Sequence, residues 1–289
     1  MEQSVQLDNG QISIEIAAMG AEMQSITGAD GRSWLWHGDE KYWTGRAPVL
    51  FPIVGKTPND MIGIGGKDYA MASHGFARRR SFELVEADAD HCIFKLEACD
   101  ETLASYPFQF RLQIEYRLIG AGVAVTGTVT NLGANGMPFQ FGYHPAFVWP
   151  LPGAEGKVHE IRLSGDAAPA LQRLRNGLLT TQRQPSPFRA GRLRLEPGLF
   201  AEDAMIFSEG AGESLVYGVA GGQCIEFSWT GLPNLALWTK RGAPFLCIEP
   251  WHGTAAKIGG SNDIMHRPYA LMLKPGVERV FGYKALFKH

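Results

Sequence analysis

The sequence has few charged residues and no uninterrupted apolar run long enough to cross a membrane. Of its 289 residues only 19% are charged, the formal net charge is -2 and the pI is near 6.5. This balance gives no overall field to attract a polyanion, and no basic run interleaved with aromatic residues indicates a nucleic-acid groove. We therefore expect neither nucleic acid nor a membrane as a partner.

Cysteine is also scarce, and its spacing excludes the commonest cysteine-based sites. Cys92, Cys99, Cys224 and Cys247 form none of the close C-x-x-C pairs that structural zinc or dithiol chemistry requires. They lie in apolar stretches, so we expect buried free thiols. The N-terminal segment MEQSVQLDNG has no apolar signal region, which favours a cytoplasmic location.

Helical patterns are missing as well, whereas strand patterns are frequent. No segment of twelve or more residues shows an amphipathic helix pattern with caps, so helices should be few and short. Apolar and polar side chains instead alternate with period two. This alternation occurs in the segments ISIEIA, SFELVEA, HCIFKLEA, FQFRLQIEYRL, GVAVTGTVTN, SLVYGV, QCIEFSW, LALWT and ERVFGYKAL. The pattern predicts an all-β fold of antiparallel sheets.

The chain is expected to form a single domain over residues 1–289. Hydrophobic residues make up 45% of it, which is enough for one large core. The proline- and glycine-rich stretch at 150–197 could be a linker, but strand-like pieces flank it, so we interpret it as long loops and short hairpins. No fixed-period repeat is visible, which favours a sandwich of large sheets over a propeller.

Three segments place polar residues among aromatics and turn formers: SHGFARRR at 73–80, FQFGYHPAF at 139–147 and CIEPWHG at 247–253. The proline after His144 disfavours helical backbone there, so the ring should project from a strand end, as a proton donor would. Glu249 also precedes a proline at an expected strand end, where burial would raise its pKa and a nearby cation would lower it. Each residue also has an ordinary structural interpretation, a histidine packed among aromatics and a carboxylate cap.

Taken together and in this order, these segments resemble the aldose 1-epimerase family, and within it the bacterial galactose mutarotase-like proteins. The resemblance spans nearly the whole chain, and it includes LDNGQISIEIAAMGAEMQSI, APVLFPIVGK, LFAEDAMIF, LPNLALWT and LKPGVERV. It implies a β-supersandwich, two large twisted antiparallel sheets whose groove binds a monosaccharide. The implied activity is interconversion of the α and β anomers of a free aldose.

The resemblance also assigns roles to particular residues. His144 matches the general acid of the family, Glu249 its general base and His74 a second histidine that contacts the sugar. Asp203 resembles the sugar-binding acid. The chemistry is an acid–base ring opening without redox change, and no H-E-x-x-H or clustered Cys/His spacing is present, so we expect no metal and no other cofactor.

Further substrate contacts are expected from Lys56, Arg78 and Trp238. Two positions depart from the bacterial pattern: Lys56 stands where arginine is usual, and Arg79 where an acidic residue is common. A lysine offers a mobile point charge instead of the planar fork of arginine, so the fit to sugar hydroxyls should differ. Phe76 and Trp251, like Trp238, could pack on the apolar face of a sugar, although a core role is commoner for aromatics.

Two alternative functions remain open. In a hexose-6-phosphate 1-epimerase the triplet at 78–80 would hold the phosphate, but on a strand Arg79 would face away from its neighbours, so we expect free hexoses to be preferred. A noncatalytic carbohydrate-binding or sensor domain could use the same fold, and the presence of both His144 and Glu249 argues against it. The chain is expected to be a monomer or a weak homodimer.

Overall fold

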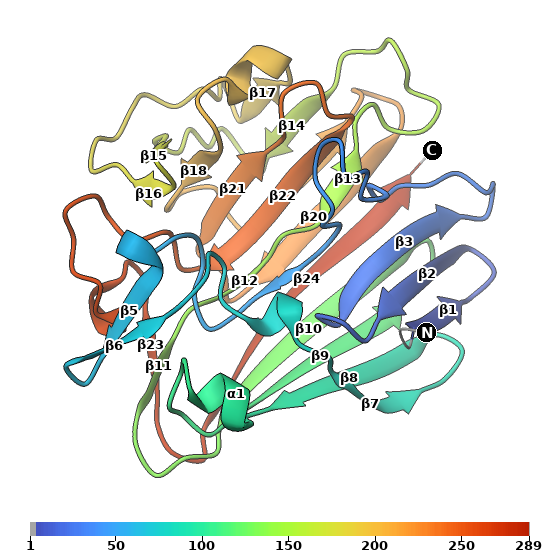
Figure 1. Cartoon of the computed structure of the whole chain (residues 1–289). Coiled ribbons are helices and arrows are strands. Elements are labelled where there is room, and N and C mark those ends of the chain that lie inside the picture. The colour runs from blue at the N-terminus through green and yellow to red at the C-terminus, as the bar shows by residue number, and fades with distance from the viewer. Residues whose placement is uncertain (1–3, 289) are drawn as a thin grey trace.

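The computed structural model describes residues 4–288 and is built almost entirely from β-strands (Figure 1). Within this range the longest helices have four residues. The helices of four residues are α1 (Asp100–Leu103) and the 3-10 helix η3 (Pro197–Phe200). The 3-10 helices η1 (Pro58–Asp60), η2 (Ala77–Arg79) and η4 (Ile264–His266) have three residues each. The predicted all-β class with few short helices is confirmed. No helix in the described part of the chain is long and apolar enough to span a bilayer.

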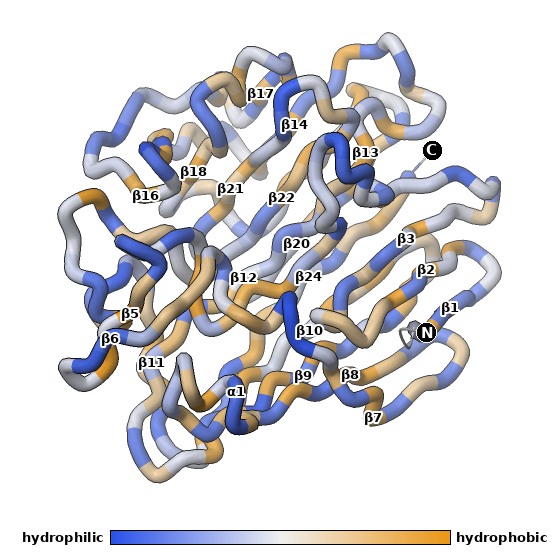
Figure 2. The backbone as a smooth tube through the Cα atoms, in the orientation of Figure 1, coloured by the Kyte–Doolittle hydropathy of each residue, from blue (hydrophilic) through white to orange (hydrophobic). Residues whose placement is uncertain are grey.

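The largest sheet has nine antiparallel strands. Their order is β17 (Arg192–Arg194), β14 (Glu160–Leu163), β19 (Ser214–Gly218), β20 (Cys224–Thr230), β24 (Glu278–Lys288), β10 (Gly122–Asn131), β9 (Phe110–Leu118), β8 (His91–Glu97) and β7 (Glu83–Ala87). Apolar and polar residues alternate along these strands, as the orange and blue segments of Figure 2 show. One face is therefore buried. Most of the strands expected from period two lie in this sheet, while ISIEIA and LALWT form strands of two other sheets.

A second sheet contains two of the three segments that the sequence singled out, FQFGYHPAF and CIEPWHG. Its path is β18 (Met205–Phe207), β21 (Asn234–Trp238), β22 (Phe245–His252), β12 (Phe141–Tyr143) and β4 (Val49–Leu50), with β13 (Ala146–Val148) also paired to β22. A third sheet holds β1 (Ser4–Asp8), β2 (Ile12–Ala17) and β3 (Glu22–Gly28). Three hairpin-sized sheets pair β5 (Met61–Ile64) with β6 (Lys67–Ala70), β11 (Met137–Phe139) with β23 (Leu271–Leu273), and β15 (Leu174–Arg175) with β16 (Leu178–Leu179).

The six-stranded sheet packs one face against the nine-stranded sheet. Phe141 stacks on Phe281 with ring centroids 4.8 Å apart, and Tyr143 meets Tyr283 at 4.9 Å. Because side chains alternate between the two faces of a strand, the residues between and after these aromatics point the other way. The outward face of the six-stranded sheet is thus free to form a site.

The stretch at 150–197 contributes β14 and β17 to the nine-stranded sheet and the β15/β16 hairpin, in keeping with the expected loops and hairpins. The expectation of four buried thiols is only half right. Cys92 and Cys247 are buried, but Cys224 is partly exposed and Cys99 is exposed at the start of α1. All four are free thiols. The helix start at Cys99 lies outside any sheet, which is why its apolar surroundings in sequence do not bury it.

Gly75 is a position where the backbone leaves no room for a side chain. Its φ is +73°, and a Cβ there would lie 2.1 Å from the carbonyl oxygen of Phe51. We expect Gly75→Ala to lower the free energy of unfolding by about 2–4 kcal/mol, since strain and overpacking add. Gly65→Ala is the matched control, because Gly65 has φ +58° and no atom within 4 Å of such a Cβ. It should cost about 1 kcal/mol. If urea unfolding showed the same loss of unfolding free energy for both variants, the close packing at Gly75 would not be the cause.

Candidate active site

Strand register brings His144 opposite Glu249. On one side of the pair, Phe141 pairs with His252 in β12 and β22, and on the other side Ala146 pairs with Cys247 in β13 and β22. The same register continues across the short break between β12 and β13, and it places His144 directly across from Glu249. Directly opposed residues of antiparallel strands project to the same face, so the two side chains must meet.

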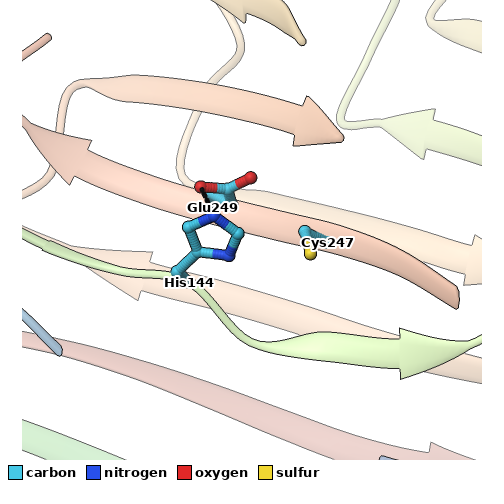
Figure 3. Close-up of side chains that lie close together, drawn as sticks. All are labelled: His144, Cys247 and Glu249. Atoms are coloured by element: carbon cyan, nitrogen blue, oxygen red, sulfur yellow. Dashed lines mark ion pairs between the residues drawn. The ribbon is translucent and has the colours of Figure 1, made fainter. Parts of the chain in front are cut away.

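The structure shows this meeting on the outward face of the six-stranded sheet. His144 Nε2 lies 3.1 Å from Glu249 Oε2, as the dashed line in Figure 3 marks. Both side chains are buried, with His144 7% and Glu249 1% exposed. His144 directly follows the last residue of β12, at the strand end that the sequence predicts. Glu249, expected at a strand end, instead lies within β22, which continues through Pro250 to His252.

Burial dominates the electrostatics of this pair. It lowers the pKa of His144 well below its usual value, and the charges of His74 and Arg78 lower it further. Burial raises the pKa of Glu249 well above its usual value, Asp203 adds to this, and the Arg78 guanidinium opposes it. Both charged forms are disfavoured, so burial favours a neutral imidazole beside a protonated carboxyl group, a pair with one titratable proton.

His74 faces the same hollow with a defined tautomer. Its Nδ1 accepts a hydrogen bond from the Gly55 amide at 3.1 Å, which leaves the proton on Nε2. Burial, together with the charges of Arg78 and Arg267, lowers the pKa of His74 to about 3. A neutral imidazole with Nε2–H is therefore available to donate to a sugar oxygen, consistent with the expected contact role.

The site is a pocket of about 410 Å³ that brings together every residue proposed from the sequence. Its lining includes the proposed residues His144, Glu249, His74, Lys56, Asp203, Arg78 and Trp238. These residues come from segments separated by up to about two hundred positions, so the sheet architecture is what assembles them. A larger hollow of about 760 Å³ lies on the outward side of the nine-stranded sheet beside Arg162, Glu226 and Lys284, and its described lining contains no histidine.

The arginines after His74 lie differently from the strand-based expectation. Residues 77–79 form the 3-10 turn η2, and both Arg78 and Arg79 line the pocket. The expectation that Arg79 faces away from its neighbours, as it would on a strand, is therefore wrong, because residues 77–79 do not form a strand. Arg79 also donates from Nη1 to the Gly75 carbonyl at 3.1 Å. The pocket thus has three cationic side chains on its wall, Lys56, Arg78 and Arg79.

Tryptophans form the apolar part of the wall. Trp238 and Trp251 line the pocket as expected, but Phe76 packs instead in the core, with ring centroids 5.8 Å from Phe110. Sequence reasoning missed Trp43, whose ring lies 4.8 Å from that of His144 at an interplanar angle of 33°. It belongs to an irregular segment without a motif, so only the fold reveals that it covers the histidine.

Two loops close the opposite side of the pocket. Asp203 lies just after η3 with φ +69°, and its Oδ1 accepts from the Ala204 amide at 2.9 Å. The β15/β16 turn packs Gly177 against the Lys56 side chain, since a Cβ on Gly177 would lie 3.0 Å from Lys56 Cδ. The expected substrate contacts of Asp203 and Lys56 are geometrically available because both reach this pocket.

The fold is that of the galactose mutarotase-like proteins. A galactose mutarotase related enzyme from Lactobacillus acidophilus superposes with a TM-score of 0.93 at 27% identity, covering 99% of this chain and 98% of that one. A galactose mutarotase-like protein from Lactobacillus casei ATCC 334 gives 0.90 at 27% identity, covering 99% and 100%.

Sequence comparison identifies the family. The model of the aldose 1-epimerase family matches residues 3–259. The chromosomal LacX protein of Lactococcus lactis subsp. lactis is 30% identical over 286 residues, which covers 94% of this chain and 95% of LacX. The chain belongs to the aldose 1-epimerase family, as the motifs predicted.

Proposed function

We propose that this chain is an aldose 1-epimerase that interconverts the α and β anomers of a free aldose. The observation that supports the proposal is the approach of His144 Nε2 to Glu249 Oε2, 3.1 Å apart, on the wall of a sugar-sized pocket. Ring opening removes a proton from the anomeric hydroxyl while the ring oxygen receives one. These two oxygens are bonded to the same carbon, so the acid and the base must also be neighbours.

The pair can perform both proton transfers with the single proton that it holds. We assign Glu249 as the base and His144 as the acid. Burial alone would leave the proton on Glu249, whereas the Arg78 guanidinium favours the carboxylate form. Transfer of this proton to His144, whose Nε2 is 3.1 Å away, gives the state in which Glu249 is the base and His144 the acid. In the reverse direction each group takes the other role, because the reaction is reversible. After ring opening, rotation about the C1–C2 bond allows closure on either face.

The other wall residues then orient the sugar. His74 donates from Nε2–H to a ring or hydroxyl oxygen, and Asp203 accepts from hydroxyl groups. Trp43, Trp238 and Trp251 offer flat apolar surfaces to the C–H face of the ring. The Trp251 Nε1–H is buried without a protein hydrogen-bond partner among the described residues, so it is available to a hydroxyl.

A second candidate substrate is an aldose with an anionic group, such as a hexose 6-phosphate. It is favoured by the position of Lys56, Arg78 and Arg79 on one pocket, where cationic side chains could converge on a phosphate. Asp203 on the same wall offsets one of these charges. We therefore place the free aldose first.

The central test is anomerisation by the purified protein, followed by polarimetry with fresh α-D-glucose or α-D-galactose. We expect a rate well above the spontaneous one, and His144→Asn and Glu249→Gln should each lower kcat by about 10²-fold or more. The double variant should be little worse than the poorer single variant, since the two residues act as one unit. A folded wild-type protein that binds sugar and leaves the spontaneous rate unchanged would support the noncatalytic alternative.

The plot of kcat/KM against pH should be bell-shaped with a broad plateau. Activity requires one proton on the pair, so it falls at low pH when His144 takes a second proton and at high pH when Glu249 loses the only one. Since the pKa of His144 is lowered and that of Glu249 is raised, the acid limb should lie below the usual histidine range and the alkaline limb above the usual carboxyl range. A profile of kcat/KM with a single limb near pH 6.5 would contradict this shared-proton scheme.

Replacing Arg78 should show whether the preferred substrate carries a phosphate group. If the free aldose is the substrate, kcat/KM for glucose should exceed that for glucose 6-phosphate, and Arg78→Met should change both by similar factors. If the phosphate binds to the cationic wall, the phosphorylated sugar should be preferred, and Arg78→Met should lower its kcat/KM by about 10-fold or more relative to glucose. Arg80→Met is the matched control, because Arg80 is outside the pocket lining. Steady-state kinetics on both sugars distinguish the two outcomes.

A further inference from the structure

A third ligand-type side chain lies beside the acid–base pair. Cys247 is two residues before Glu249 on β22, so both project from the same face of the strand. One ligand atom from each of His144, Cys247 and Glu249 lies within 4.8 Å of the other two (Figure 3). All three are buried, and neither the sequence motifs nor the proposed reaction gives the thiol a role.

The hydrogen-bonding state of this cluster points to a ligand. Glu249 Oε2 is buried without a hydrogen-bond partner in the described part of the chain. Although Glu249 Oε2 lies 3.1 Å from His144 Nε2, the contact is not aligned as a hydrogen bond. Such buried, unpaired atoms are rare in native structures and call for a partner.

The spacing suits a small cation with tetrahedral coordination. Nitrogen and oxygen ligands lie about 2.0–2.1 Å from Zn²⁺, which puts two of them about 3.3 Å apart. The 3.1 Å separation of His144 Nε2 and Glu249 Oε2 is already close to that value. The thiol needs only a side-chain adjustment, because its sulfur is within 4.8 Å. His144 and Glu249 line the pocket, which gives an ion a path of entry and an open fourth position.

We propose that His144, Cys247 and Glu249 form an inhibitory site for a thiophilic divalent cation, Zn²⁺ or Cd²⁺. One ring nitrogen, one carboxylate oxygen and the thiolate bind the ion, and the thiol proton leaves to solvent on binding. The mixed imidazole, thiolate and carboxylate set selects these cations over Mg²⁺ and Ca²⁺, which prefer oxygen ligands. A bound ion occupies both groups of the acid–base pair, so it excludes catalysis rather than assisting it.

Binding is tested without any substrate. Metal-free protein is titrated with Cd²⁺ while the ultraviolet charge-transfer band of a Cd–thiolate bond is recorded. We expect saturation at one ion per chain, and a midpoint at least about tenfold higher in Cys247→Ala. Cys247→Ser, which keeps the side-chain volume, covers the case in which the alanine variant does not fold. Cys99→Ala removes the exposed thiol and should leave the titration unchanged. A midpoint that follows Cys99 and not Cys247 would overturn the site.

Inhibition is tested separately and rests on the proposed epimerase activity. Zn²⁺ should inhibit anomerisation competitively with the sugar, EDTA should restore the rate, and Mg²⁺ should have no effect. The half-inhibitory concentration, measured against each variant's own metal-free rate, should rise about tenfold or more in Cys247→Ala and stay unchanged in Cys92→Ala. A Cys247-dependent Cd²⁺ band without inhibition would overturn the inhibitory role. Protein without any anomerase activity would overturn the proposed function, and the Cd²⁺ titration would still decide the site.

Discussion

The pocket depends on a buried guanidinium that has no carboxylate partner within residues 4–288. Arg267 is 3% exposed, and it donates to the carbonyl oxygens of Val54, Lys56 and Thr254 and to Gln140 Oε1 at 2.6–3.3 Å. Burial lowers its pKa to about 9, so it remains charged at neutral pH. Removing an unpaired charge from water costs several kcal/mol, and these four acceptors offset that cost only while their backbone segments stay in place.

This constraint explains how loops can hold a precise site. Two of the carbonyls that surround Arg267, those of Val54 and Lys56, belong to the segment that also presents the Lys56 side chain to the pocket. The amide of Gly55 in that segment fixes the tautomer of His74. The segment packs so closely on the neighbouring one that a Cβ on Gly55 would lie 2.7 Å from Ala255. Arg267 therefore positions two pocket-lining side chains, Lys56 and His74, without lining the pocket itself.

The period-two alternation of apolar and polar residues predicts the longer strands and the all-β class. The reason is that one face of each such strand is buried, so apolar residues recur at every second position. The motifs around His144 and Glu249 identified the catalytic candidates, and strand register explains why they meet. The sequence could not show what irregular backbone does. Arg78 and Arg79 converge because residues 77–79 form a turn, Trp43 reaches His144 from a segment without periodicity, and Arg267 has no local pattern that distinguishes it from a surface arginine.

Burial of His144 and Glu249 underlies both the proposed acid–base reaction and the proposed inhibition by metal ions. Excluding water from His144 and Glu249 disfavours both charged forms. A neutral pair with one titratable proton suits the proposed reaction, which moves protons between two adjacent oxygens. Yet buried polar atoms without protein partners are also strong ligands for any cation that can enter, and Cys247 supplies the soft donor beside them. An alanine at this position would pack in the same small aromatic cluster without that donor. The thiol thus adds a response to thiophilic metals that neither the fold nor the acid–base chemistry requires.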